Sequence, residues 1–111
     1  MYLTDESGPR KVVSTPLAFE AIVRQRCLVG TYNRQRVTLA PHALFTRNEA
    51  LYLVAVTIDR DGQPPREAKI GLFKLDGLAG ITLIERPFER SPLFEPADER
   101  FAATTLMAVE G

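Results

Sequence analysis

Short apolar runs rich in β-branched residues, separated by turn formers, make up most of the chain after its first quarter. Runs of this kind are typical of β-strands. The strongest, residues 50–58, is apolar throughout its middle, which predicts a central strand buried on both faces. Four more strands are predicted, at residues 27–32, 36–40, 68–75 and 81–85. We expect the second to pair weakly at Pro41 and to continue toward Phe45.

Before the strands, the pattern predicts one amphipathic helix over residues 16–25. Thr15 followed by Pro16 is a helix start, because threonine accepts from first-turn amides and proline at the first position lacks an amide anyway. Glu20 and Arg24 lie four apart and can pair on the polar side. The apolar face contains Leu17, Ala18, Ala21 and Ile22.

One helix followed by five closely spaced strands favours an antiparallel sheet that curls into a small barrel. We expect a mainly β domain at residues 14–101, an N-terminal tail at 1–13 and a C-terminal tail at 102–111. The segment 59–65, with its Asp-Gly and Pro-Pro pairs, is predicted to be a polar loop. Prolines at 87, 92 and 96 predict an extended surface segment, and the pattern of residues 97–109 is compatible with either a short helix or a strand.

Charge and composition narrow the classes of function. Fourteen basic and fourteen acidic side chains cancel, which argues against broad phosphate binding as the main activity. With one cysteine, Cys27, no internal disulfide can form. The N-terminus lacks the apolar segment of a secretion signal and no run is long enough to span a membrane. We therefore expect a cytoplasmic protein without a membrane association.

The sequence gives little evidence for catalysis. We expect that the protein is not an enzyme and holds no cofactor. Cys27 lies among apolar neighbours and is expected to be a small buried hydrophobe. Acidic pairs occur only in loop-like segments, and the glycines lack the spacing of a phosphate-binding loop. His42 is the only histidine and has no carboxylate or cysteine companions, so we expect no metal site.

Two blocks of sequence resemble a known family. Tyr52-Leu53-Val54-Ala55 and Phe73-Lys74-Leu75-Asp76, with Ala21-Ile22, Tyr32 and Pro41 at matching places, resemble the motifs of WYL domains. The resemblance covers residues 17–101 and implies an Sm-like or SH3-like barrel preceded by a helix. It also implies a ligand-sensing regulatory module. Members often follow a DNA-binding helix-turn-helix, for which this chain has no room, so we expect a free-standing version.

Departures from the family pattern concern the ligand site more than the core. Leu51 stands where the family has tryptophan, which keeps hydrophobic character. Lys74 and Gly77 stand where the family has arginines, and Gly71 occupies another place that is often basic. Lysine holds an anion as a point charge, whereas arginine binds phosphate through two parallel hydrogen bonds. The resemblance therefore implies a thinned basic ligand site.

Each candidate ligand-binding residue has a structural alternative. Tyr52 resembles the family's ligand-facing tyrosine, whereas a tyrosine in a half-buried strand is more often a core residue whose hydroxyl is bound by a neighbour. Tyr32 shares a face with Leu28, and packing alone would explain it. His42 is compatible with a structural role. The cations that would form a basic pocket, or alternatively protect strand edges, are Arg36, Lys69 and Lys74.

Two hypotheses of function follow. In the first, the domain binds a small anionic or nucleotide-like ligand, or a short single-stranded nucleic acid, by stacking and charge. In the second, it has lost its ligand and acts by self-association or by docking on a protein partner through the apolar strand at 51–58 or the proline-rich segment. The missing arginines favour the second hypothesis, and the family resemblance favours the first.

Overall fold

The structure is a computed structural model that describes residues 7–110, with side chains described for residues 14–110. Helix α1 spans Ser7–Arg24 and contains Pro16 in its interior. The predicted start at Thr15 and Pro16 is therefore wrong, and residues 7–13 belong to the helix. An internal proline removes one backbone hydrogen bond. The helix tolerates this loss because the apolar face that follows Pro16 anchors it on the sheet. Residues 1–6 of the predicted tail lie outside the described residues.

The five predicted strands are confirmed, four of them within two residues at either end and the second continuing to Arg47, and a sixth is added. All pairs are antiparallel, and the hydrogen-bonded order is β4-β3-β2-β1-β5, with β6 on β2. Short 3-10 helices, η1 (Leu75–Gly77) and η2 (Ala102–Thr104), precede β5 and β6. The strands are β1 (Arg26–Tyr32), β2 (Gln35–Arg47), β3 (Ala50–Arg60), β4 (Ile70–Lys74), β5 (Ala79–Pro87) and β6 (Thr105–Ala108).

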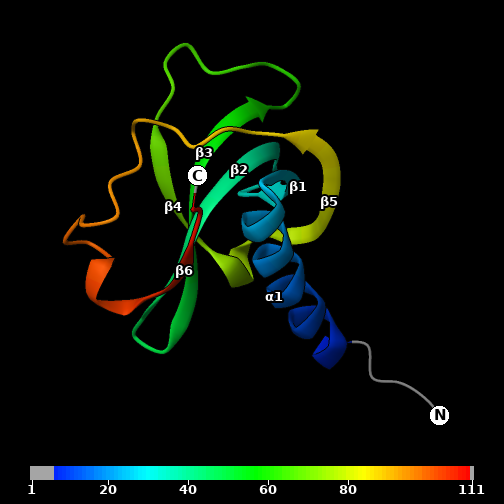
Figure 1. Ribbon diagram of the computed structural model, residues 1–111. Helices are drawn as coiled ribbons and strands as arrows, with labels where there is room; N and C mark the ends of the chain where they lie inside the picture. The colour runs from blue at the N-terminus through cyan, green and yellow to red at the C-terminus, as the bar shows by residue number, and fades with distance from the viewer. Residues whose placement is uncertain (1–6, 111) are drawn as a thin grey trace.

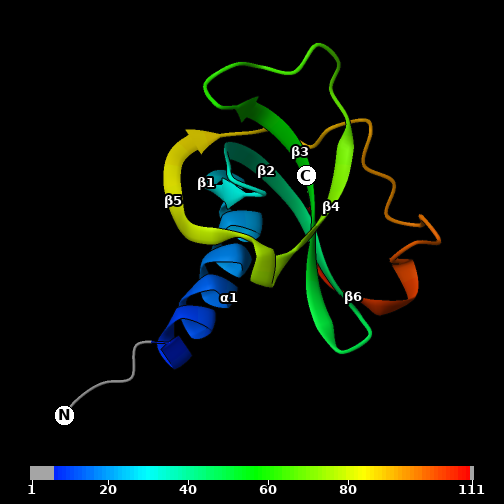
Figure 2. The same cartoon turned by 180° about the vertical axis from the view of Figure 1, so that it is seen from behind.

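The sheet is strongly bent but open, which corrects the expectation of a closed barrel. Among the described residues β4 and β5 stand at opposite ends of the pairing order. The chain passes between them through η1, which contributes the buried side chain of Leu75 but no ladder. Both views show β5 curling around the β1 end of the helix (Figures 1 and 2). The mainly β class with one N-terminal helix is confirmed.

Strand β2 is the spine of the sheet. Over its length it pairs with β3, its first part pairs with β1, and residues 43–45 pair with β6. Pro41 lies opposite Ala55, and the register shifts between Pro41 and Ala43. A bulge is one of the few places where a central strand accepts a proline. The proline therefore bends β2 without ending it.

The central strand β3 is buried on both faces, as predicted. Leu53, Val54 and Ala55 are completely buried although they alternate between the faces. On one side, α1 contacts β1, β2 and β5 and contributes Ala18, Ala21 and Ile22 to the core. Burying such side chains is the main source of stability in a domain of this size.

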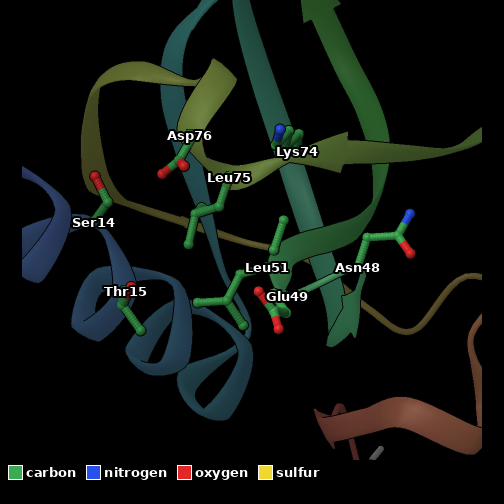
Figure 3. Close-up of a pocket in the computed structure, with 9 residues that line it drawn as sticks. Ser14, Thr15, Asn48, Glu49, Leu51, Lys74, Leu75 and Asp76 are labelled. Atoms are coloured by element: carbon green, nitrogen blue, oxygen red, sulfur yellow. The ribbon is translucent and has the colours of Figure 1, made fainter.

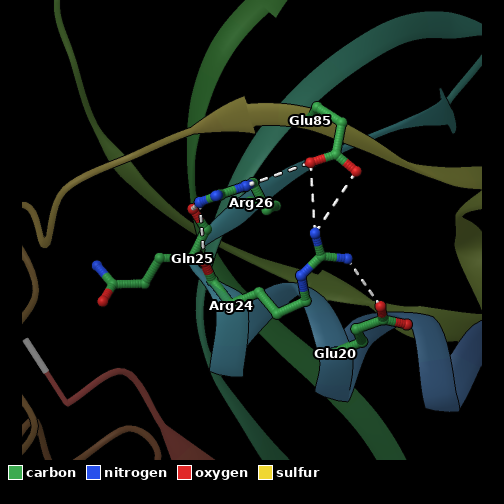
Figure 4. A network of polar contacts seen from close by, with 5 residues as sticks. All are labelled: Glu20, Arg24, Gln25, Arg26 and Glu85. Atoms are coloured by element: carbon green, nitrogen blue, oxygen red, sulfur yellow. Dashed lines mark hydrogen bonds and ion pairs between the residues drawn. The ribbon is translucent and has the colours of Figure 1, made fainter.

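Ion pairs fasten α1 to β5 at the surface (Figure 4). Arg24 pairs with Glu20 at 2.9 Å, one turn earlier, and with Glu85 of β5 at 3.3 Å. Arg26 reaches the same Glu85 carboxylate at 3.6 Å. These groups are largely exposed, so the network orients the helix more than it stabilises the fold.

The segment 88–101, which we call the strap, covers the other side of the sheet. It leaves β5, crosses the molecule and returns through η2 to β6 (Figures 1 and 2). Phe94 and Phe101 are 4% and 2% exposed. Residues 88–96 lie outside the sheet and mostly at the surface, as expected, but Phe94 and, further along the strap, Phe101 insert their rings into the core. The expected C-terminal tail, 102–111, contains η2 and β6.

Candidate functional site

A continuous column of six rings fills the space between the sheet and the strap. Successive ring centroids lie 5.0 to 6.2 Å apart, the range in which aromatic side chains attract each other beyond simple burial. In order along the column the rings belong to Tyr52, Phe45, Phe101, Phe94, His42 and Phe88. The Tyr52 end is half-buried, so the column begins at the surface.

Two cations flank Tyr52 at that end. Phe45, Tyr52 and Lys74 are direct neighbours on β2, β3 and β4, so their side chains project from the same face. The guanidinium carbon of Arg47 lies 5.5 Å from the Tyr52 ring centroid and 5.4 Å from that of Phe45. Cation–π contacts of this length are weakly favourable at exposed sites. The arrangement joins a stacking surface to two positive charges.

Neither cation is neutralised by an ion pair with another residue among those whose side chains are described. Arg47 donates through Nη2 to the backbone carbonyl oxygen of Arg100 in the strap, at 3.0 Å. Arg100 itself is engaged by Asp98 at 2.8 Å, and this contact lowers the pKa of the Asp98 carboxyl. Arg47 and Lys74 are exposed. An anion at Tyr52 would therefore meet two available charges.

A two-residue turn builds this end of the sheet. Asn48 and Glu49 connect β2 to β3 with φ values of 51° and 66°, as expected for a tight hairpin turn of the type I′ class. The turn places Arg47 opposite Ala50. Arg47 and Tyr52 are therefore close because the register is fixed by the shortest kind of connection.

A cavity of about 440 Å³ adjoins the same hairpin. Figure 3 shows Ser14 and Thr15 of α1 on one side of it and Lys74, Leu75 and Asp76 on another. Leu51, at the place of the family's tryptophan, lines it as well. Of the two sequence blocks compared with the WYL motifs, the second lines this cavity through Lys74, Leu75 and Asp76, whereas residues 52–55 of the first are not among its lining residues. Glu49 and Asp76 make its lining mixed in charge.

His42 lies in the interior of the column rather than at a ligand-accessible surface. It is 0% exposed. Its Nδ1 lies 2.8 Å from the Ala40 carbonyl oxygen, and the Ser91 amide donates to Nε2 at 3.0 Å. Burial lowers the pKa of His42, with Arg90 acting in the same direction and the Ala40 hydrogen bond opposing it. The ring therefore acts as a neutral structural group, and a ligand contact through it would require the strap to move.

The other three candidates do not converge on Tyr52. Tyr32 stacks edge-on against Phe73, with centroids 5.1 Å apart, and Phe73 points to the opposite face from Lys74 because side chains alternate along a strand. Arg36 is near the far end of β2, where its amide donates to Asp61 at 2.9 Å. Lys69 precedes β4, at the end away from Lys74. Of the six predicted residues, only Tyr52 and Lys74 come together.

Sequence reasoning missed Arg47 and Phe101. Arg47 precedes the polar pair Asn48-Glu49 and by residue type looks like part of the turn, although counting back from the turn places it two residues from Phe45 on the same face. Phe101 stands alone in a polar segment, and an isolated aromatic gives no periodic signal. Register arithmetic could thus have found the first residue, whereas the second depends on the path of the strap.

The remaining chemistry of the described residues is sparse. Burial raises the pKa of the Cys27 thiol, which disfavours the reactive thiolate. Histidine, cysteine and acidic side chains in the described region form no group of three that could hold a metal ion. Among the described residues, no helix is both long enough and apolar enough to cross a membrane. Comparison with protein-family models, curated proteins and solved structures finds no match to this chain.

Proposed function

We propose that this protein is a ligand-sensing module that binds a small anionic or nucleotide-like ligand, or a short single-stranded nucleic acid, at Tyr52. The observation that carries the proposal is the half-exposed Tyr52 ring between the cations Arg47 and Lys74. Aromatic stacking next to positive charge is the usual way to hold a nucleobase and its phosphate without reading its sequence. The tyrosine supplies the surface, and the cations supply the charge.

The topology supports a relationship to the Sm-like or SH3-like architecture that WYL domains have. The helix precedes four strands that follow one another as antiparallel neighbours, and the fifth strand pairs back onto the first. The strong curvature of the sheet is consistent with that architecture (Figure 2). We propose a WYL-like module whose site has been rebuilt, with Arg47 from β2 standing in for arginines that the family carries after β4.

The charge of the site limits the ligands that it can hold. Two cations that contact phosphates predict a salt slope of about −1.4 for a single strand, since each neutralised phosphate contributes about −0.7. The net charge of zero adds no attraction at long range. Binding should therefore be modest and confined to short ligands.

The test is a titration of purified protein with mononucleotides and short oligonucleotides at low and high salt. Tyr52→Ala should abolish saturable binding, and Lys74→Ala should weaken binding and flatten the salt slope by about 0.7. Lys69→Ala is the matched control, because it removes a lysine on the same edge of the sheet at the other end of β4. Equal effects of Lys74→Ala and Lys69→Ala would refute the site, and flat titrations of the unchanged protein would refute the function.

A second function, docking of a protein partner or self-association, is favoured by an apolar surface on α1 and β6. Val23 of α1 is 71% exposed. A groove of about 370 Å³ between the two elements is lined by Ile22, Val23, Met107 and Ala108, and the polar residues Gln25 and Glu110 complete its lining. Sedimentation separates this function from the first: a dimer that Val23→Asp dissociates, in a protein without ligand binding, would establish it.

A further inference from the structure

His42 is held at the meeting point of β2 and the strap. The Ala40 carbonyl oxygen, 2.8 Å from Nδ1, can only accept, so Nδ1 carries the proton. The amide of Ser91 can only donate, so Nε2 must offer its lone pair at 3.0 Å. The two contacts together select one neutral tautomer. The backbone of the same residue accepts from the Val109 amide at 2.8 Å, which fastens the end of the chain to it as well.

The strap is attached in part through this ring, while Gln25 holds the backbone of Phe88 by two separate hydrogen bonds of 3.1 and 3.3 Å. Phe88 and Phe94 pack against His42 with centroids 5.0 and 5.4 Å away, so the ring contacts the strap by its nitrogen and by its faces. A proton on Nε2 would place two donors, Nε2–H and the Ser91 amide, against each other. It would also put a positive charge in an interior where no carboxylate is among the buried side chains of residues 14–110. Both effects favour separation of the strap from β2.

The groups around the ring reinforce this behaviour. From the strap, the charged neighbour is Arg90, whose guanidinium carbon lies 5.6 Å from the Phe94 ring centroid and whose charge opposes protonation of His42. On the far side of Phe88, Cys27 is a buried thiol that stays neutral. From β2 the ring meets the Ala40 carbonyl oxygen, and from the chain end the Val109 amide meets its backbone. A buried imidazolium would therefore find little compensation there.

We propose that the strap is an acid-sensitive clasp: protonation of His42 at Nε2 breaks the Ser91 hydrogen bond and releases residues 88–101 from the sheet. The clasp is linked to the Tyr52 site, because the Arg100 carbonyl in the strap accepts from Arg47 and the Phe101 ring packs on Phe45. Release removes both supports and lowers the affinity of that site for an anion. Only this last consequence rests on the proposed function.

The experiment follows the ring and the strap by NMR while the pH is lowered from 8 to 5. The chain contains one histidine, so its ring signals report His42 alone. We expect a single ring titration with a midpoint below about 6.5, the ordinary histidine value. Hydrogen-exchange protection of the strap amides, Ser91 above all, should fall at the same midpoint while the β2–β3 hairpin stays protected. A strap that keeps its protection through the ring titration, or a sheet that unfolds with it as one unit, would overturn the clasp.

His42→Gln provides the matched variant, because its side-chain oxygen can accept from Ser91 and has no proton to gain in this range. It should keep the strap closed at all pH values tested. A closed strap in the unchanged protein decides against the clasp even when this variant does not fold.

Oligothymidylate binding is measured in parallel. Affinity that falls with pH in the unchanged protein and not in His42→Gln supports the link to Tyr52. An intact strap transition without binding at any pH would refute the proposed function and leave the clasp standing.

Discussion

Phe101→Ala is expected to destabilise the whole domain, although the residue lies in a segment with almost no regular structure. The Phe101 side chain is 2% exposed and packs between the rings of Phe45 and Phe94, at centroid distances of 5.4 and 6.2 Å. Truncating a buried phenylalanine to alanine costs about 3–5 kcal/mol. A domain of this kind has a total stability of about 5–15 kcal/mol, so the change removes a large fraction of it.

Urea denaturation followed by circular dichroism measures this loss, with Leu93→Ala as the control. Leu93 lies in the same strap but is 47% exposed, and substitutions at such positions stay within about 0.5 kcal/mol. The slope of the unfolding free energy against urea gives a second readout, because it scales with the surface that unfolding exposes. An unchanged slope means that the variant exposes the same surface on unfolding and has lost stability alone. A Phe101→Ala midpoint equal to that of Leu93→Ala would refute the role assigned to the strap.

Three further outcomes are expected. Gly30→Ala should destabilise by about 1–3 kcal/mol in thermal or urea unfolding, because a Cβ there would lie 3.0 Å from Cγ2 of Ile81. Burial lowers the pKa of His42, so its neutral form contributes stability above about pH 6.5 that is lost as the pH falls through the folded-state pKa. The slope should be at most about 1.4 kcal/mol per pH unit in melts of the unchanged protein and absent in His42→Gln. Glu85→Gln should lower the melting temperature slightly at low salt and not in 1 M salt, since its pair with Arg24 is exposed.

The strands could be predicted from the sequence because their evidence is local. The uninterrupted apolar stretch around Leu53 and Val54 requires burial on both faces, and the polar pairs at the turns mark where each strand stops. The start of α1 could not be predicted in the same way. The local preference of Pro16 is for a first helical position, and its place inside α1 depends on contacts with the sheet that offset the lost hydrogen bond.

Only part of the candidate site could be predicted from the sequence, for a similar reason. Tyr52 and Lys74 come from blocks that resemble a known motif, and register makes them neighbours. Tyr32 and Lys69 are equally reasonable by residue type, but strand alternation and strand length separate them from Tyr52. No local pattern in the sequence indicates that the Phe101 ring completes the column, because its partner Phe45 lies in a segment some sixty residues earlier in the chain.

Residues 43–45 of β2 pair with β3 on one side and with β6 on the other. This pairing has a consequence for the order in which the sheet forms. Within the described residues, 43–45 receive their second neighbour from β6, at positions 105–108, which the ribosome makes after β2 and β3. During translation the backbone N–H and C=O groups around Leu44 stay unpaired on one side until β6 has been made. Unpaired strand edges of this kind attract other chains. Slow synthesis or premature termination before β6 should therefore yield aggregates, whereas in a chain that includes β6 this edge of β2 is paired.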